Sequence, residues 1–551
     1  MRSGRFSRQP IVVPLPKPQL AESRVKPRKN TFPRHRFQSS TARRIVRAMR
    51  AWRAARWNAR RLEAAASRPF STSHPRTRQQ KIADLLRNGS FDETVSVQGW
   101  VRSVRKQKKV AFVTVGDGST VSNLQATTPP DQATNLSHGA AVRLSGEWKA
   151  SPGRGQSHEL ANSSVEVLGA NDAEANPLQP KYQTPEFLRT IPHLRARIPQ
   201  NALMLRLRSQ LIAALTNFFI AEDFVQCHTP VITSSDCEGA GEVFTVSSNE
   251  GRPSDQATKG KAGEQGEHFF RTPKYLTVSA QLHLEALAQS VNKVWTLSPT
   301  FRAEKSDTPR HLSEFYMLEA EMCFTRNLDE VMDLVENMLR SAVTTMKDGR
   351  IYEELQKIKA QPLNSQPNEG LHDISPETLD QRWTGITAPS WPRITYAEAI
   401  THLQTAQTPF STPANHLTGL QAEHERYLAT HLGAGKPLFI THYPRAQKPF
   451  YMPPSHPGAS TAACFDLLVP DLCELVGGSL REHRLADLRA AMQTKAVKGE
   501  GLEWYQDLRR FGSVPHGGFG LGFDRLLCYL GGVGNVRDVV GFPRWYGRCE
   551  C

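Results

Sequence analysis

The positive charge of this chain is concentrated at its N-terminus, and this limits which part can form a globular body. Residues 1–80 contain 21 Lys and Arg residues and only two acidic residues, so they carry a net charge of +19. The rest of the 551-residue chain contains 48 basic and 51 acidic residues and is nearly neutral. The total charge of +16 therefore does not indicate a nucleic-acid-binding body. The nearly neutral part is long enough for two or three domains.

The basic N-terminal segment has the composition of a mitochondrial presequence, which is rich in Arg and poor in acids. Residues 41–66 alternate arginines with Ala and other apolar residues, which predicts an amphipathic basic helix. Arg68-Pro69-Phe70-Ser71 follows and resembles a matrix-protease site. We therefore predict a presequence over 1–70, cleavage near Phe70/Ser71 and a mitochondrial matrix location. A basic RNA-binding tail is the alternative.

Residues 91–170 read as short strands separated by turns. Five such strands in this length predict a small closed barrel, of which the OB-fold is one candidate. The loop 102–109 is basic, and Phe112 lies in the next strand. A basic groove beside an aromatic ring suits single-stranded nucleic acid. The alternative is that Phe112 belongs to the core and the lysines to a solvated loop.

The remaining chain is predicted to be one larger domain. Residues 171–195 read as a hinge, and leucines at i+4 spacing then predict a helix from about 203 to 219. Asn327 and Glu330 form a capping box that opens another helix. Polar residues 247–267 and the Pro-containing residues 361–392 are predicted insertions. No run of 18 apolar residues occurs, so no transmembrane segment is predicted.

Three stretches carry residue combinations suited to binding a phosphate compound. The first has Arg302, Glu304 and His311 between two apolar segments, which predicts an antiparallel hairpin with a polar loop. Arginine offers a planar fork to phosphate. An isolated Arg–Glu pair on a strand is usually a structural salt bridge, so this stretch gains weight only beside the other two.

The second stretch runs from Asp466 to Glu482, and the third from His516 to Leu527. In the second, the carboxylates of Asp466 and Glu474 could hold Mg²⁺ beside phosphate, and Arg481 adds a cation. The third is a Gly-rich strand that enters a helix carrying Arg525 in its first turn. Glycines let a ligand come close to the backbone, and an arginine can stack on a purine ring and bind phosphate, so this stretch suits a purine nucleotide.

In this order, the three stretches resemble the motifs of class II aminoacyl-tRNA synthetases, and the preceding barrel points to the aspartyl, asparaginyl and lysyl subgroup. Within it, residues 237–244, 277–285, 313–321, 448–452, 465–470 and 536–544 most resemble asparaginyl-tRNA synthetases of the mitochondrial type. Aspartyl relatives usually carry Lys where Leu284 stands. Asp524 replaces the more usual Glu but keeps its charge. The resemblance implies an α+β protein, in which an OB-fold barrel at 91–170 precedes an antiparallel-sheet catalytic domain at 196–551.

The resemblance also implies a two-step reaction, in which ATP activates asparagine and the acyl group then passes to a terminal hydroxyl of tRNA(Asn), the 3′-OH for this class. Arg302, Glu304 and Arg525 are the implied catalytic residues. The implied site residues are Arg302, Glu304, Arg310, His311, Phe315, Glu474, Gly522 and Arg525 for ATP; Glu238, Gln281, Glu285, Arg302 and Arg481 for asparagine; Asp466 and Glu474 for Mg²⁺; and Phe112 and Gln125 for the anticodon.

A homodimer around Pro230 is implied as well, because this subgroup dimerises through its first motif. Two other functions remain open at this stage. One is an aspartyl-tRNA synthetase, and the other is a catalytically dead, synthetase-derived RNA-binding protein. The intact set of Arg302, Glu304, Glu474 and Arg525 disfavours the second alternative.

Overall fold

The computed structural model describes residues 80–88, 93–153, 156–234, 242–248, 269–360, 374–497, 499 and 501–551. The predicted presequence 1–70 with its cleavage site, Glu238 and most of the predicted insertion 247–267 lie outside the described residues.

The N-terminal part of the described chain is a closed five-stranded barrel, as predicted for an OB-fold. The strands are β1 (Glu93–Lys106), β2 (Ala111–Gly116), β3 (Leu124–Thr128), β4 (Ala141–Ala150) and β5 (His158–Gly169), in the order β1-β2-β3-β5-β4. Buried residues alternate with more exposed ones along most of β2, β3 and β4. Together with residues of β1 they form a core that includes Val97, Val113 and Leu144. Helix α2 (Ile82–Asn88) adds Ile82 and Leu85 to this core.

The larger, C-terminal part is built on an eight-stranded sheet of order β12-β13-β14-β15-β16-β11-β10-β6. It is antiparallel from β13 to β10, and only its two edge pairs are parallel. Its strands are β6 (Val225–Gln226), β10 (Lys293–Phe301), β11 (Glu314–Cys323), β12 (Arg393–Thr395), β13 (Leu438–Thr441), β14 (Cys464–Val469), β15 (Cys473–Arg481) and β16 (His516–Gly522). A small second sheet holds β7 (Ile232–Thr233), β9 (Lys274–Leu276) and β8 (Thr245–Val246).

The predicted hairpin is confirmed, because β10 pairs with β11 from Lys293↔Met322 to Phe301↔Glu314. Alternation along β11 places Leu318, Ala320 and Met322 in the main core, whereas the residues between them face the other side of the sheet. The chemistry-bearing residues of this strand therefore share one face.

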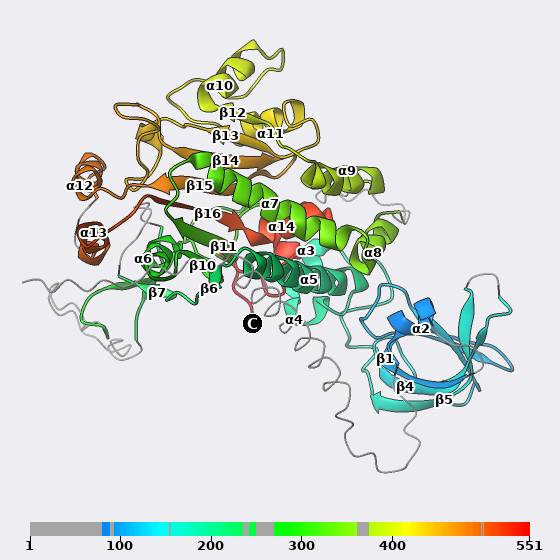
Figure 1. Ribbon diagram of the computed structural model, residues 1–551. Helices are drawn as coiled ribbons and strands as arrows, with labels where there is room; N and C mark the ends of the chain where they lie inside the picture. Colours follow the sequence, from blue (N-terminus) through cyan, green and yellow to red (C-terminus); the bar gives the residue numbers. More distant parts are fainter. Residues whose placement is uncertain are drawn as a thin grey trace, which may run out of the picture. The chain divides into compact units, whose positions relative to one another are not determined.

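Helices cover the core face of the sheet. α5 (Pro199–Ala221) and α7 (Leu328–Lys347) pack against each other and run across the sheet (Figure 1). The leucines that predicted α5 are buried, and both halves of the predicted capping box of α7 are formed. Among the described residues, only α5 is long and apolar enough to cross a membrane by length and composition. Its buried leucines pack against α7, as in a core helix of a globular domain.

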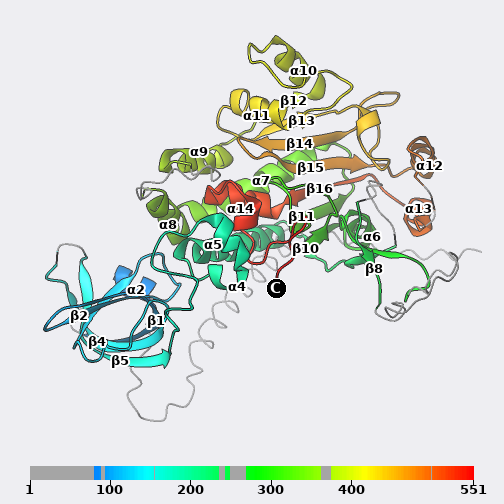
Figure 2. The same ribbon diagram turned by 180° about the vertical axis from the view of Figure 1, so that it is seen from behind.

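A second group of helices gathers at the end of the sheet where β11 ends and β16 begins. These helices are α6 (Gln281–Val291), α12 (Leu485–Thr494) and α13 (Glu503–Arg510), and both views show them together (Figures 1 and 2). The remaining helices are α3 (Pro185–Thr190), α4 (Pro192–Arg195), α8 (Arg350–Lys359), α9 (Pro376–Thr387), α10 (Tyr396–Thr405), α11 (Ala422–His431) and α14 (Phe523–Gly531), with short 3₁₀ turns at Arg445–Gln447 and Val536–Asp538.

Two predicted irregular segments contain ordered helices. In the predicted insertion 361–392, helix α9 buries Leu379, Trp383 and Ile386 in the main core, so this half is not an irregular insertion. In the predicted hinge 171–195, α3 and α4 carry arginines that bind the Val536–Asp538 turn, with Arg189 bonding Asp538 at 2.6 Å. Tertiary contacts order both segments despite their prolines. Pro185, Pro192 and Pro376 begin α3, α4 and α9, and the start of a helix is where proline is tolerated.

Candidate active site

Residues of the three chemistry-bearing stretches line one cavity at the meeting of β11, β15 and β16. They converge because β16 pairs with β15 on one side and with β11 on the other. The cavity is lined by Arg302, Glu304, Arg310, His311, Leu312, Phe315, Met317, Glu474, Leu475, Gly520, Gly522, Asp524, Arg525 and Val536. All eight residues predicted for ATP are among them, so the fold brings this predicted set together.

Arg302 and Glu304 lie at the start of the loop that follows β10. The backbone N–H of Arg302 donates to the carbonyl of Ser313 at 3.0 Å, which fixes the beginning of the loop. Its guanidinium lies 3.7 Å from a carboxylate oxygen of Glu304 and 5.9 Å from the centre of the Phe315 ring. A ligand in the cavity can therefore meet a planar cation, a carboxylate and an aromatic face at once.

His311 contributes a neutral ring to the same cavity. Burial lowers the pKa of His311, and Arg525, Arg310 and Arg302 lower it further against the opposing effect of Glu304. The imidazole is therefore uncharged near pH 7 and can donate one hydrogen bond, while the arginines supply the positive charge.

Arg525 lines the cavity and is held by its own contact with β15 and by the contacts of its neighbour Asp524. Its guanidinium donates to the carbonyl of Glu474 at 2.8 Å. The adjacent Asp524 pairs with Arg208 of α5 and accepts the backbone N–H of Tyr316 at 2.8 Å. Burial raises the pKa of Asp524, and Arg208 counteracts this. Asp524 therefore anchors the start of α14 and, with it, Arg525.

The two predicted metal ligands lie on the same face of β14 and β15. A Cβ built on Gly477 would meet an oxygen of Glu474 at 3.4 Å and one of Asp466 at 3.6 Å, so both carboxylates flank this glycine. The ammonium of Lys448, which the sequence interpretation missed, bonds both oxygens of Asp466 at 3.1 and 2.9 Å. Burial raises the pKa of Glu425 to about 7, with Glu474 and Asp466 adding to the rise. The carboxylates are thus crowded, and Lys448 balances only part of their charge.

Glycine is required in this sheet where side chains of the site lie against the backbone. A Cβ at Gly518 would stand 2.2 Å from the carbonyl of Ala320 and 2.3 Å from the Glu321 carboxyl group. A Cβ at Gly478 would stand 2.3 Å from the Phe465 ring. The Gly-rich stretches therefore serve internal packing as well as an open cavity.

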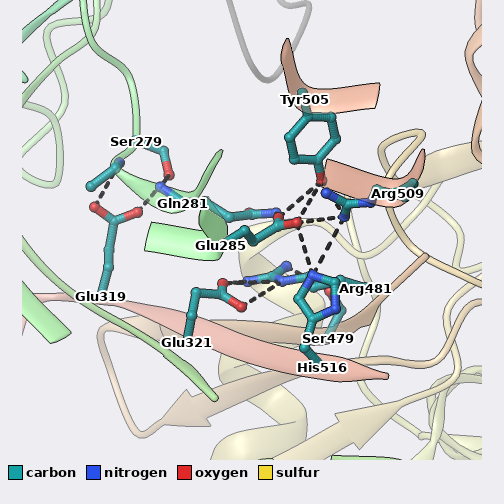
Figure 3. A network of polar contacts seen from close by, with 11 residues as sticks. Ser279, Gln281, Glu285, Glu319, Glu321, Ser479, Arg481, Tyr505, Arg509 and His516 are labelled. Atoms are coloured by element: carbon teal, nitrogen blue, oxygen red, sulfur yellow. Dashed lines mark hydrogen bonds and ion pairs between the residues drawn. The ribbon is translucent and has the colours of Figure 1, made fainter. Parts of the chain in front are cut away.

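Beside this cavity, β11, β15 and β16 carry a second group of buried charges (Figure 3). Arg481 is 4 % exposed and bonds Glu321 through two nitrogens, at 2.5 and 3.1 Å, and Ser479 at 2.7 Å. Glu319 accepts from the backbone N–H of Ala280 at 2.9 Å and from Ser279 at 2.5 Å. The two glutamates alternate with core residues along β11, and the sequence interpretation gave them no role.

Glu285 is at the centre of the network in Figure 3 and is 0 % exposed. Its carboxylate accepts bonds from four side chains: Gln281 at 2.9 Å, Tyr505 at 2.8 and 3.0 Å, Arg509 at 2.5 Å and His516 at 3.0 Å. Burial alone would raise the pKa of Glu285, but Arg509 and His516 bring it below its usual range. Four side chains of the protein thus bond this carboxylate, and its predicted direct contact with asparagine stays a prediction.

The two residues predicted for the anticodon lie on the same outer face of the paired strands β2 and β3, with Phe112 opposite Thr127 and Gln125 opposite Thr114. Their neighbours along β2 and β3 are buried, whereas Phe112 and Gln125 point outward. The guanidinium of Arg105 lies 4.8 Å from the centre of the Phe112 ring, and Gln125 donates to Glu159 at 3.2 Å. This face offers an aromatic ring, a cation and an amide to a nucleic acid base.

Comparison with known proteins finds family matches for both parts of the chain, the barrel and the larger part that follows it. Residues 184–546 match the family described as tRNA synthetases class II (D, K and N), and residues 95–168 match the OB-fold nucleic acid binding domain. The chain is 41% identical to the asparagine–tRNA ligase of Nostoc sp. over 471 residues, covering 84% of this chain and 98% of the relative. It is 40% identical to the mitochondrial asparagine–tRNA ligase of Schizosaccharomyces pombe, covering 83% and 95%. It also resembles the crystal structure of asparaginyl-tRNA synthetase from Pyrococcus horikoshii complexed with asparaginyl-adenylate, with a TM-score of 0.71, 27% identity and coverage of 86% and 100%.

Proposed function

The chain belongs to the class II tRNA synthetases (D, K and N), and from this we propose how its residues attach asparagine to tRNA. It is an ATP-dependent aminoacyl-tRNA ligase, and its relatives at about 40% identity over most of the chain are asparagine–tRNA ligases. The single observation that carries the proposal for its residues is the convergence of the eight predicted ATP residues on one cavity, beside the buried Arg481–Glu321 pair.

In the first step, the asparagine carboxylate attacks the α-phosphorus of ATP and pyrophosphate leaves. Two anions meet in this reaction, and Arg302 is placed to bind both. Glu304 accepts from the adenine amino group, the ring stacks on Phe315, and Arg525 covers its other face. Arg310, His311 and Arg525 bind the outer phosphates. Each of these side chains lines the cavity, which supports the assignment.

The donor set fits Mg²⁺ that arrives with ATP. Two carboxylates flank Gly477, and hard oxygen ligands are what Mg²⁺ prefers. In the described part of the chain, no three His, Cys, Asp or Glu side chains are arranged to hold a metal, so the phosphates would complete the shell. Asp466 and Glu474 would hold the ion, which supplies neutralisation of phosphate charge. Lys448 would then keep Asp466 ionised and oriented.

Asparagine is proposed to lie between α6 and β15, with its side chain toward Arg481. The guanidinium of Arg481 can donate to the amide oxygen, and the carboxylate of Glu321 can accept from the amide NH₂. The α-ammonium group needs acceptors, which Glu319 and the amide oxygen of Gln281 can provide. Glu238 is proposed to close the site from the segment outside the described residues.

In the second step, a hydroxyl of the terminal adenosine of tRNA(Asn) attacks the acyl carbon of the asparaginyl-adenylate, the ester forms, and AMP leaves. We propose that the barrel binds the anticodon, with a base stacked on Phe112 and an edge read by Gln125. The outward position of both side chains beside Arg105 supports this assignment.

The reaction is tested by ATP–pyrophosphate exchange with the purified protein. We expect exchange that depends on asparagine and is at most weak with aspartate. Exchange that prefers aspartate would support an aspartyl enzyme, and absence of exchange with either amino acid would support the RNA-binding alternative. Either result would overturn the proposed reaction.

We propose that the protein is a homodimer that pairs around Pro230. Exposed apolar side chains lie on α5 and on the short strands that follow it, namely Leu205, Ile220, Val225 and Ile232. Their exposed fractions run from 42% to 64%, and apolar surface of this kind favours a protein partner. A second copy would also bury the outer face of α5.

The mitochondrial matrix is the proposed location, because a +19 segment precedes a nearly neutral body. We expect the organellar protein to begin close to Phe70 or Ser71 and to be the form that charges mitochondrial tRNA(Asn). N-terminal sequencing of the protein from isolated mitochondria measures this. A chain that still begins at Met1, or a pool held in the nucleus, would contradict the presequence.

A further inference from the structure

Helix α13 lies outside the three chemistry-bearing stretches, yet two of its side chains reach into the buried network of Figure 3. Tyr505 and Arg509 are four residues apart and share one face of the helix. Their relative exposures are 0% and 6%, and both bond the carboxylate of Glu285. Arg509 also donates to the hydroxyl of Tyr505 at 2.8 Å, so the two hold each other in place.

Glu285 in turn bonds Gln281, one helical turn earlier on α6. The amide nitrogen of Gln281 donates to Oε1 of Glu285 at 2.9 Å. An amide side chain presents a donor at one end and an acceptor at the other, so a carboxylate at the nitrogen determines where the oxygen points. Within the described part of the chain, no hydrogen bond to the amide oxygen of Gln281 is formed. This oxygen is therefore the available acceptor of the side chain.

We propose that Glu285, braced by Tyr505 and Arg509 of α13, is a positioning residue that fixes the amide of Gln281 with its oxygen toward the α-ammonium group of the amino acid substrate. The inference rests on the proposed function, because it needs an amino acid bound beside Gln281 and Arg481. Without the carboxylate, the amide could turn and present its NH₂ group to the substrate ammonium. Two donors would then face each other, and binding of the α-amino group would weaken.

The test compares asparagine with succinamic acid, which is asparagine without the α-amino group. We expect Glu285→Gln to raise the KM for asparagine in ATP–pyrophosphate exchange by about tenfold or more. The inhibition constant of succinamic acid should stay within about twofold of the parent value, because this compound has no group to meet Gln281. The KM for ATP should also be unchanged.

Three further variants show whether the effect passes through Gln281. In a Gln281→Ala background, Glu285→Gln should add little to the KM for asparagine, because the amide it orients is already gone. Tyr505→Phe keeps the ring. It should also raise the KM for asparagine without changing the inhibition constant of succinamic acid, but by a smaller factor than Glu285→Gln. Asp507→Asn, on the exposed side of α13, should behave as the parent.

A purely structural role for Glu285 predicts a different result. If Glu285→Gln weakens the binding of asparagine and of succinamic acid equally, the proposal is overturned. It is also overturned if the effect of Glu285→Gln on the KM for asparagine adds fully to that of Gln281→Ala. If Glu285→Gln does not fold, Tyr505→Phe is measured instead. The ratio of its KM for asparagine to the inhibition constant of succinamic acid should rise above that of the parent, and an unchanged ratio overturns the proposal. Asparagine-dependent ATP–pyrophosphate exchange by the parent protein tests the proposed function separately, before any variant is measured.

Discussion

Replacing Arg302 with alanine is expected to reduce asparagine-dependent ATP–pyrophosphate exchange by about 10²–10³-fold. The reaction brings the asparagine carboxylate to the α-phosphate, and without a shared cation the two anions repel each other. Arg302 lies between the loop start fixed by Ser313 and the ring of Phe315, so its guanidinium is already in place before the reaction. Initial exchange rates at saturating ATP and asparagine measure the effect.

Arg302→Lys is the informative companion, because it keeps the charge but loses the planar fork, and an intermediate rate is expected. Stability should change little in both variants, because an ion pair of partly exposed groups contributes about 0–1 kcal/mol. Arg510→Ala removes an exposed arginine outside the cavity and should exchange at the parent rate. An exchange rate for Arg302→Ala within tenfold of the parent rate would contradict a catalytic role for Arg302.

The grouping of the residues that line the cavity could be predicted from the sequence, because many of them lie close together in the chain. Arg302, Glu304, His311 and Phe315 all lie within one hairpin, and an antiparallel hairpin is a local structure with a readable period. The other two stretches could be joined to it only through the family resemblance. Their actual neighbours follow from the strand order β15-β16-β11, which no local pattern encodes.

The buried charges were harder to predict because each depends on a partner far away in the chain. Glu285 reads as a polar residue on a helix, and its confinement follows from the packing of α13 against α6. Lys448 likewise gives no local sign that it binds Asp466. By contrast, helix α9 had a readable start, with Ser375 as the N-cap and Pro376 at the first position. The prolines of residues 361–392 nevertheless favour irregular structure, and this is why the sequence interpretation does not predict the helix.

Replacing Glu321 with glutamine is expected to lower the preference for asparagine over aspartate by at least tenfold from a starting value of about 10³. In the parent, Glu321 neutralises Arg481, and an aspartate carboxylate would have to compete with it for the guanidinium. Burial raises the pKa of Glu321, and Arg481 opposes this, whereas Glu321 raises the pKa of Arg481 despite its burial. The neutral glutamine leaves Arg481 with an unbalanced charge, which should cost about 3–5 kcal/mol of stability.

This unbalanced charge gives the experiment a second readout. Aspartate brings the missing negative charge, so it should raise the unfolding temperature of Glu321→Gln more than asparagine does, the reverse of the order in the parent. Glu319→Gln is the matched control. It removes a carboxylate two residues earlier on β11 that bonds the backbone of Ala280 rather than Arg481. Glu319→Gln should weaken the binding of asparagine and aspartate alike, because both carry the same α-ammonium group. If Glu321→Gln folds and keeps the parent ratio of exchange rates, the Arg481–Glu321 pair does not select the side chain.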